Sequence, residues 1–169
     1  KEETEILNKA AIIWAISEED RQWITKHTNQ KNALLLPVSV TLNPEIEVDY
    51  QNKDFFHLGS MDWKPNQEAV NYLVKKIWSN PKISGFTLRI AGSKSEHFGF
   101  YATNSIEVLG WVKDSNAFMA KSGTLVTPIL SGSGIRIKLL EAMSLGIPCI
   151  TTKLGASGID ISKSGLQIA

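Results

Sequence analysis

The sequence has little cysteine, no long apolar run and no excess of charge of either sign, and each absence narrows the class of protein. Cys149 is the only cysteine among 169 residues, so no disulfide forms within the chain. It lies in the apolar run IPCIT, which predicts a buried strand residue and fits a reducing compartment. No apolar run approaches the roughly 18 residues that a membrane-spanning helix requires, so we expect no transmembrane segment.

The charges nearly cancel, with 18 Lys and Arg against 17 Asp and Glu and a formal net charge of +1. A field this weak draws in neither nucleic acid nor an anionic membrane, so we expect no nucleic-acid partner. The hydrophobic fraction of 43% and the charged fraction of 21% are ordinary for a soluble globular protein. The chain shows no signal-peptide pattern, does not begin with Met and stops within the strand-like GLQIA. We therefore expect a piece of a longer protein, truncated at both ends.

What is present is an alternation of short apolar runs with longer amphipathic segments. Runs that are apolar throughout are typical of strands covered on both faces, and we expect strands at 11–17, 33–38, 54–60, 86–92, 106–112, 124–130 and 147–152. We expect helices from Ser17 to about Lys26, from Pro65 to Asn80, at 116–121 and after 131–134, with an irregular linker at 41–54. Right-handed crossovers turn this order into a parallel α/β sheet with helices on both faces. The alternative, an α+β protein with an antiparallel sheet, needs hairpin turns that the sequence does not show.

The loops after the expected strands are the first place to look for a ligand, because open parallel sheets bind ligands at the carboxyl ends of their strands. Each of these loops contains glycine, at 59–61, 92–94, 110–113, 131–134 and 153–155. The 131–134 loop is expected to open a helix, whose free N–H groups and partial positive charge favour phosphate. Arg136 and Lys138 add cationic donors. The loop lacks the motif of a P-loop and is weak as a dinucleotide fingerprint, so a plain Gly/Ser helix cap remains the alternative.

Glu141 is an acidic residue in the apolar stretch LLEAM. If the helix runs on from Gly134, Glu141 stands about 10 Å along it, roughly the span from a nucleotide's diphosphate to its ribose hydroxyls. A carboxylate there accepts two hydroxyl hydrogen bonds. The alternative is a partly exposed Glu141 paired with Lys138.

Three stretches carry a family resemblance. PILSGSGIRIKLLEAMSLGIPCITTKLGASGI, at 128–159, resembles the donor-nucleotide signature of the family 4 (group 1) retaining glycosyltransferases, which have the two-domain GT-B fold. FHLGSMDWKPNQEAVNYL, at 56–73, is similar to the start of their C-terminal domain, and AIIWAISEEDRQWI, at 11–24, to the end of their N-terminal domain. The resemblance implies the tail of an N-terminal domain at 1–42, a linker at 43–53 and a partial, Rossmann-like, nucleotide-sugar-binding domain at 54–169.

The resemblance also implies roles for individual residues. Glu141 matches the second Glu of the family's Glu-x7-Glu element, which binds the ribose hydroxyls, and Ser133 stands where the first Glu usually faces the donor sugar. Arg136, and Lys138 second to it, are expected to neutralise the leaving diphosphate. Lys64 stands before Pro65 rather than before the usual glycine, so its role as a phosphate ligand is open. The other expected donor contacts are Gly59 and Ser60 at the diphosphate, Trp111, Val112 and Lys113 at the base, and Gly132, Gly134 and Ile135 in the signature loop.

The function implied is transfer of a sugar from a nucleoside diphosphate with retention at the anomeric carbon. The resemblance implies a hexosyltransferase without metal or other cofactor, acting in polysaccharide biosynthesis in the cytoplasm or at the inner face of the membrane. The carbohydrate or lipid-linked acceptor, and any peripheral membrane contact, would belong to the other half of the protein. Two alternatives stay open: a non-catalytic GT-B-like binding module and, less favoured, a nicotinamide-binding oxidoreductase domain.

The histidines and most of the tryptophans are expected to be structural. His57 falls within a strand and is expected in the core, whereas His27 and His97 are expected on the surface. Core packing is expected for most of the tryptophans in or beside apolar runs, which are Trp14, Trp63, Trp78 and Trp111. The alternative role for a tryptophan is stacking on carbohydrate, and Trp63, in the loop MDWKP, is the first candidate for it. We nevertheless expect its ring to pack beneath that loop.

Overall fold

The computed structural model describes residues 2–41, 45–160 and 166–169. The chain divides into two compact units, Lys1–Ser39 and Val40–Ala169. Each unit is described by itself. Of the linker expected at 43–53, residues 43 and 44 lie outside the described residues. In the remainder, the backbone N–H of Asp49 donates to the carbonyl of Ala120 (2.8 Å) and the Asn52 side chain donates to the carbonyl of Lys121 (2.8 Å), so this stretch packs against the second unit.

The first unit is a small β-α-β arrangement preceded by a helix. It comprises α1 (Glu2–Lys9), β1 (Ile13–Ala15), α2 (Glu18–His27) and β2 (Ala33–Leu35), and β1 pairs in parallel with β2. Helix α2 begins where the sequence predicts, and Ser17 is its N-cap, since the Ser17 hydroxyl accepts from the backbone N–H of Asp20. Helix α1 was not predicted, because it is mostly polar and buries no residue.

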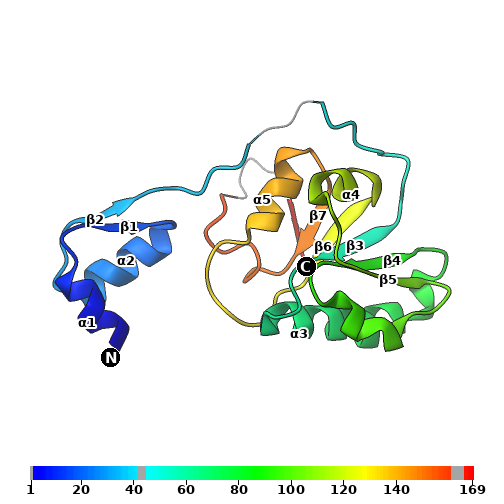
Figure 1. Cartoon of the computed structure of the whole chain (residues 1–169), viewed down its shortest axis with the longest axis horizontal. Coiled ribbons are helices and arrows are strands. Elements are labelled where there is room, and N and C mark those ends of the chain that lie inside the picture. Colours follow the sequence, from blue (N-terminus) through cyan, green and yellow to red (C-terminus); the bar gives the residue numbers. More distant parts are fainter. Residues whose placement is uncertain (1, 42–44, 161–165) are drawn as a thin grey trace. The chain divides into compact units, whose positions relative to one another are not determined.

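The second unit is built on a six-stranded parallel sheet (Figure 1). Its strands are β3 (Phe55–Leu58), β4 (Leu88–Ala91), β5 (Ile106–Gly110), β6 (Thr124–Thr127), β7 (Cys149–Thr151) and β8 (Leu166–Ile168). Their order is β5-β4-β3-β6-β7-β8, and every pair is parallel. After β3 the next strands in the sequence, β4 and β5, are added on one side of it. The strands after β6, which are β7 and β8, are added on the opposite side of the sheet. The topological switch point therefore lies between β3 and β6.

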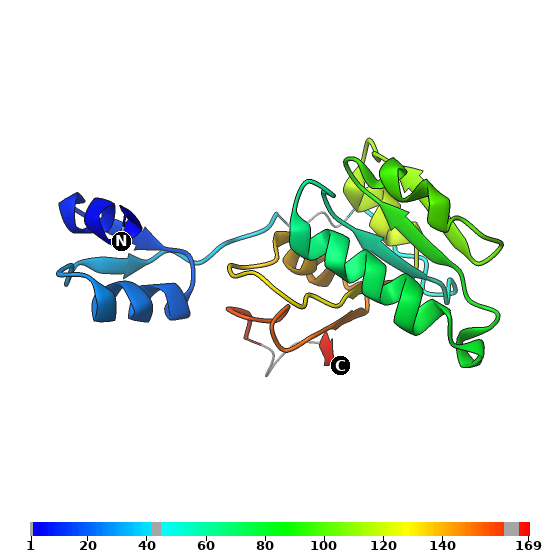
Figure 2. The same ribbon diagram turned by 90° about the horizontal axis from the view of Figure 1, so that it is seen from below.

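Helices cover both faces of this sheet, as the sequence predicts (Figures 1 and 2). On one face lies α3 (Lys64–Tyr72), which continues as a π-helical segment, Leu73–Trp78. Val70 and Leu73 pack there against Leu88 and Ile90 of β4. On the other face lie α4 (Ser115–Lys121) and α5 (Ile137–Ser144), with a core of Phe56, Leu125, Met119, Leu139 and Ala142. Two 3-10 segments, Pro81–Ile83 and Ser95–Tyr101, complete the unit.

Two buried side chains behave as expected from the sequence. Cys149 is buried in β7, and desolvation raises the pKa of its thiol to about 12. His57 is fully buried in β3, where its Nδ1 lies 3.0 Å from the carbonyl oxygen of Val126. Desolvation lowers the pKa of His57 to about 4, so the ring is neutral at physiological pH.

The expectation that most tryptophans pack in the core is wrong for three of the four. Trp78 does pack, edge-on, against Phe55. Trp14 is 57% exposed because successive residues of β1 point to opposite faces of its two-stranded sheet. Trp111 is 68% exposed because it follows the end of β5 in the loop before α4. Among the described helices, none has the length and apolar character needed to cross a membrane.

Candidate functional site

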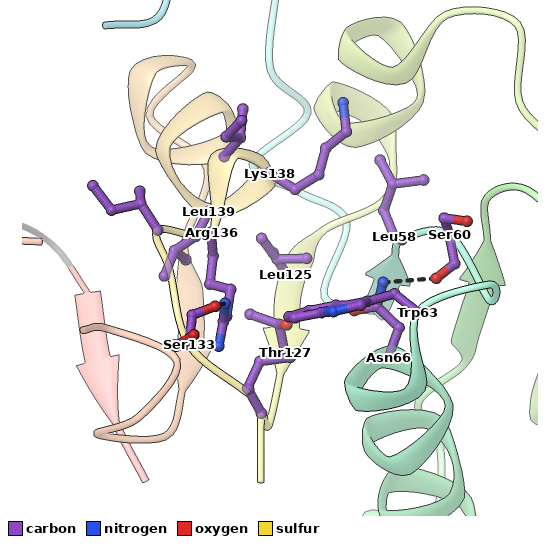
Figure 3. Close-up of a pocket in the computed structure, with 14 residues that line it drawn as sticks. Leu58, Ser60, Trp63, Asn66, Leu125, Thr127, Ser133, Arg136, Lys138 and Leu139 are labelled. Carbon is purple, nitrogen blue, oxygen red and sulfur yellow. Dashed lines mark hydrogen bonds between the residues drawn. The ribbon is translucent and has the colours of Figure 1, made fainter. Parts of the chain in front are cut away.

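A cavity of about 330 Å³ lies at the switch point of the sheet (Figure 3). Its walls come from stretches that are far apart in the sequence: the end of β3, the start of α3, β6 with the residues after it, and the start of α5. The polar and aromatic side chains among its lining residues are Ser60, Trp63, Asn66, Thr127, Ser133, Arg136 and Lys138. This is where open parallel sheets place their ligands.

The turn between β3 and α3 is held in a close-packed form. The side-chain amide of Asn66 donates to the carbonyl of Ser60 (2.9 Å), and a Cβ added at Gly59 would lie only 2.5 Å from the Asn66 nitrogen. A Cβ at Gly92 would lie 2.1 Å from the carbonyl oxygen of Gly59. Gly92 is therefore needed for the ends of β3 and β4 to approach each other, and Gly59 leaves room for the Asn66 amide against the turn. Sequence reasoning missed Asn66, whose only signal was an amide in the first turn of a helix.

The loop 131–136 does not open α5 directly, which corrects the expectation from the sequence. Gly132 and Gly134 both have φ of +88°, the left-handed region, and Arg136 is an extended N-cap, so the helix begins at Ile137. The amides of Gly132 to Gly134 are thus loop amides, and Glu141 is not placed by a continuous helical rise from Gly134. The loop is fastened at its start, where the Ser131 hydroxyl donates to Oε2 of Glu68 on α3 (2.5 Å).

Arg136 is the central cation of the cavity. Its Nη1 donates to the carbonyls of Ser133 (2.6 Å) and Gly134 (2.8 Å), and its guanidinium carbon lies 4.7 Å from the centre of the Trp63 ring. Burial lowers the pKa of the guanidinium, although an arginine stays charged at physiological pH. Among the residues that the structure describes, no carboxylate pairs with it.

Two nitrogens of Arg136 have no partner. Nε and Nη2 are both buried and make no hydrogen bond. These two atoms form one edge of the planar guanidinium, the edge that binds two oxygens of a phosphate or carboxylate side by side. Buried donors without partners are rare and call for water or a ligand. The chemistry of this edge therefore fits an oxyanion.

Lys138 links the cavity to the neighbouring helices. Its Nζ lies 2.5 Å from Oε2 of Glu141 and 3.2 Å from Oγ of Ser115, at the start of α4. Glu141 thus has the partner that the alternative reading of the sequence gave it, and it does not line the cavity. The contact with Ser115 brings the loop that holds Trp111, Val112 and Lys113 close to the first turn of α5.

The structure brings part of the predicted set together. Gly59, Ser60, Ser133, Ile135, Arg136 and Lys138 line one cavity, with Gly132 and Gly134 in the same loop. Trp111, Val112, Lys113 and Glu141 lie outside its lining. Lys64 is largely exposed and lies 3.9 Å from Glu68. In the described part of the chain, no group of three or more His, Cys, Asp or Glu side chains is placed to hold a metal ion.

The prediction that Trp63 packs beneath its loop is wrong. Its side chain is 38% exposed and lines the cavity, with Arg136 against its ring. The signal in the sequence was its position four residues after Gly59, at the end of a strand, where side chains face the ligand edge of the sheet.

Fold and cavity together define a Rossmann-like α/β domain with a cationic side chain at its switch point. The model of one family, described as glycosyl transferases group 1, matches residues 52–169. The chain belongs to this family. No curated protein sequence matches the chain.

Solved structures share the fold, and they are glycosyltransferases with the GT-B fold. A mutant of S. aureus TarM, in complex with fondaparinux, alpha-GlcNAc-glycerol and UDP, is 17% identical with a TM-score of 0.76, over 98% of this chain and 36% of that one. HepE of Anabaena, in complex with UDP-glucose, is 14% identical with a TM-score of 0.73, over 98% and 52%. WaaG, involved in lipopolysaccharide biosynthesis, is 18% identical with a TM-score of 0.63, over 83% and 44%. The chain thus spans about a third to a half of the length of these proteins.

Proposed function

We propose that the second unit binds the nucleoside-diphosphate-sugar donor of a retaining glycosyltransferase of family 4. The observation that carries this proposal is the unpartnered Nε and Nη2 edge of Arg136, buried at the switch-point cavity of a domain in a glycosyltransferase family. The diphosphate of the donor supplies the oxygens that this edge lacks. UDP bound to S. aureus TarM and to Anabaena HepE supports a nucleotide of this class as the ligand.

In the reaction that we propose, the bond between the anomeric carbon and the diphosphate oxygen breaks while an acceptor hydroxyl bonds to the same face of that carbon. The proton of the acceptor hydroxyl passes to the departing diphosphate oxygen, and negative charge develops on the diphosphate as the bond breaks. Arg136 stabilises this charge with its free edge, and the amides of the loop 132–134 add neutral donors. Fixed donors aimed at developing charge are the main electrostatic contribution to such a step. Lys138, in the first turn of α5, supplies the second cation.

We assign the remaining donor contacts to the other predicted residues. Glu141, held by Lys138, accepts hydrogen bonds from the ribose hydroxyls, and the backbone of Trp111, Val112 and Lys113 meets the base. Gly59 and Ser60 approach the diphosphate from the end of β3. The carbohydrate or lipid-linked acceptor binds outside this unit. We place the protein in the cytoplasm, where Cys149 stays reduced, and in polysaccharide biosynthesis. The reaction that we propose uses no metal ion or other cofactor.

One observation favours a second candidate, a non-catalytic binding module. Ser133 lines the cavity where the family's pattern has a Glu, so the donor sugar meets a hydroxyl instead of a carboxylate. Both candidates bind the nucleotide, and they differ in turnover. Release of nucleoside diphosphate from UDP-sugars and GDP-sugars in the presence of acceptor by the intact protein decides between them. The nicotinamide-binding alternative has no support, since β7 ends at Thr151 without an acidic residue for the adenosine ribose.

The donor-site assignment is tested by titrating the 169-residue chain with UDP, GDP and ADP while following the backbone amides by NMR. We expect one nucleotide to shift the amides of residues 132–141 most strongly. Arg136→Met should weaken its binding about tenfold or more, since it removes a charge-assisted bidentate contact. The matched control is Arg21→Met, which removes an arginine that pairs with Glu18 on α2. Shifts confined to other segments, or equal affinities for the two variants, would contradict the assignment.

A further inference from the structure

We propose that Trp63 is a positioning residue of the donor site, which holds the guanidinium of Arg136 in the orientation that binds the diphosphate. This inference deepens the proposed function and rests on it. The sequence marks Trp63 only by its position four residues after Gly59, and its role follows from the contacts that the fold brings together.

Trp63 occupies a position that core packing does not explain. It is the N-cap residue of α3, yet its side chain makes no capping hydrogen bond. A large aromatic ring, 38% exposed, instead forms part of the wall of a cavity lined by several polar groups (Figure 3). An aromatic face exposed to a cavity is a poor place to gain hydrophobic stabilisation, but it attracts a cation.

The cation against this ring is Arg136, with its guanidinium carbon 4.7 Å from the ring centre. This distance lies within the range of a favourable cation–π contact, which strengthens where water is excluded. Arg136 is partly buried and has no carboxylate partner in the described part of the chain. The ring therefore contributes the electrostatic stabilisation that an acidic residue would otherwise supply, and it leaves the guanidinium charge available to a ligand.

The same ring also supports the loop that carries Arg136. A Cβ added at Gly132 would lie 3.2 Å from Cζ2 of Trp63 and 3.0 Å from Cγ of Pro65, so the backbone of the loop packs directly on these two side chains. Ser131 is tied to Glu68, one turn further along α3. The start of α3 thus contacts the loop at Ser131, at Gly132 and again at Arg136.

These contacts have a consequence for the free edge of the guanidinium. Nη1 is held by the carbonyls of Ser133 and Gly134, and these bonds alone leave the group free to tilt about that nitrogen. Contact with the Trp63 ring, 4.7 Å from the guanidinium carbon, restricts this tilt and so limits the directions in which the Nε and Nη2 edge can point. Fixing a long arginine side chain before the ligand arrives removes an entropic penalty from binding.

The experiment measures the affinity of the 169-residue chain for UDP, or for whichever nucleoside diphosphate binds, by calorimetry. Trp63→Leu, which removes the aromatic face, should weaken binding about 5- to 30-fold, and Trp63→Phe, which keeps a smaller face, about threefold or less. In an Arg136→Met background, Trp63→Leu should change the affinity by less than about twofold, because Trp63 acts through Arg136. Phe100→Leu removes another exposed aromatic ring of the second unit, outside the cavity, and should change nothing.

Three results would overturn the inference. If Trp63→Leu binds the nucleotide as tightly as the unchanged chain, Trp63 does not position Arg136, while the donor site itself stands. If Trp63→Leu weakens binding equally with and without Arg136, the ring contacts the ligand or only supports the loop. If the unchanged chain binds no nucleoside diphosphate, the proposed function fails together with the inference. Should Trp63→Leu not fold by circular dichroism, Trp63→Phe and Trp63→Met replace it, with the loss again expected only while Arg136 is present.

Discussion

Burial lowers the pKa of two basic side chains of the second unit, partly buried Arg136 and fully buried His57, but only Arg136 keeps its charge. Arg136 keeps its charge because two carbonyls and an aromatic face surround it at the cavity. His57, fully buried in β3, has only the Val126 carbonyl at Nδ1, and its Nε2 has no partner. Desolvation therefore lowers the pKa of His57, and the ring stays neutral in the folded state.

His57 should make folding stability depend on pH. Its pKa is about 4 in the folded chain and about 6.5 when exposed, so the unfolded chain binds more protons between these values. Stability should be complete above about pH 6.5 and fall as the pH is lowered towards 4, by about 2 kcal/mol between pH 7.5 and pH 5. Urea unfolding at both pH values measures this loss. The His57→Gln variant should show a smaller loss, and equal losses in the two chains would assign the effect to other groups.

Glu141 should affect binding more than stability. It forms an ion pair with Lys138 that is partly exposed, and such pairs contribute about 1 kcal/mol or less. We expect Glu141→Gln to weaken nucleotide binding about three- to tenfold, because a neutral amide accepts ribose hydroxyls less strongly, with little change in the free energy of unfolding. Calorimetric titration and urea unfolding give the two quantities. Glu107→Gln, which changes the exposed partner of Arg89, is the control. An unchanged affinity would leave Glu141 only as the partner of Lys138.

At the scale of elements, the cavity depends on how closely the ends of β3 and β4 approach each other. Gly92 has φ of +119°, and the carbonyl oxygen of Gly59 occupies the space where its Cβ would be. Gly85 has a similar φ of +94°, but open space surrounds the position of its Cβ. Comparing alanine substitutions at Gly85 and Gly92 therefore separates the energetic effect of the backbone conformation from that of a steric clash.

Gly92→Ala should destabilise the second unit more than Gly85→Ala. The left-handed φ alone disfavours alanine by about 1 kcal/mol, which is the whole effect expected for Gly85→Ala. The clash with Gly59 adds about 1–3 kcal/mol for Gly92→Ala. Chemical denaturation of both variants compares them. Equal losses of stability would mean that the turn after β3 moves aside without penalty.

At the scale of the whole molecule, the reactivity of the only cysteine can be used to measure unfolding of the second unit. Cys149 lies in β7 at the centre of the cluster that contains Phe56, Leu139 and Ala142, and burial raises the pKa of its thiol to about 12. A thiol reagent attacks the thiolate, which the folded chain neither exposes nor ionises at pH 8.

Labelling of Cys149 should therefore follow unfolding of the second unit. At pH 8 a thiol-specific reagent should leave the folded chain almost unmodified and react fully in denaturant, because unfolding returns the thiol to its ordinary pKa. Mass spectrometry after short pulses of reagent across a urea series measures the modified fraction. We expect its midpoint to coincide with that of β-sheet circular dichroism. Rapid labelling in the absence of urea would show that β7 opens locally.

The sequence predicted most strands of the second unit because buried strands leave clear apolar runs in the sequence. Strands covered on both faces are mostly apolar, as at 54–60, 86–92 and 147–152. All three predictions are confirmed, by β3, β4 and β7. It did not predict α1, which is mostly polar and buries no residue, or the 3-10 segment Ser95–Tyr101, where only Phe98 and Tyr101 pack against the apolar core. It also placed the start of α5 too early, because Gly132 and Gly134 can continue a helix or break it.

By itself the sequence determined the parallel α/β class, the buried strands and the signature loop, since these follow from local apolar patterns and glycine positions. Only the tertiary structure decided that Trp63 leaves the core to face Arg136, and that Arg136 keeps one edge of its guanidinium without a partner. These residues are separated by more than seventy positions, and their contact exists because β3 and β6 are neighbours in the sheet. A pattern along the chain carries no information on which side chains meet across a switch point, because that depends on strand order.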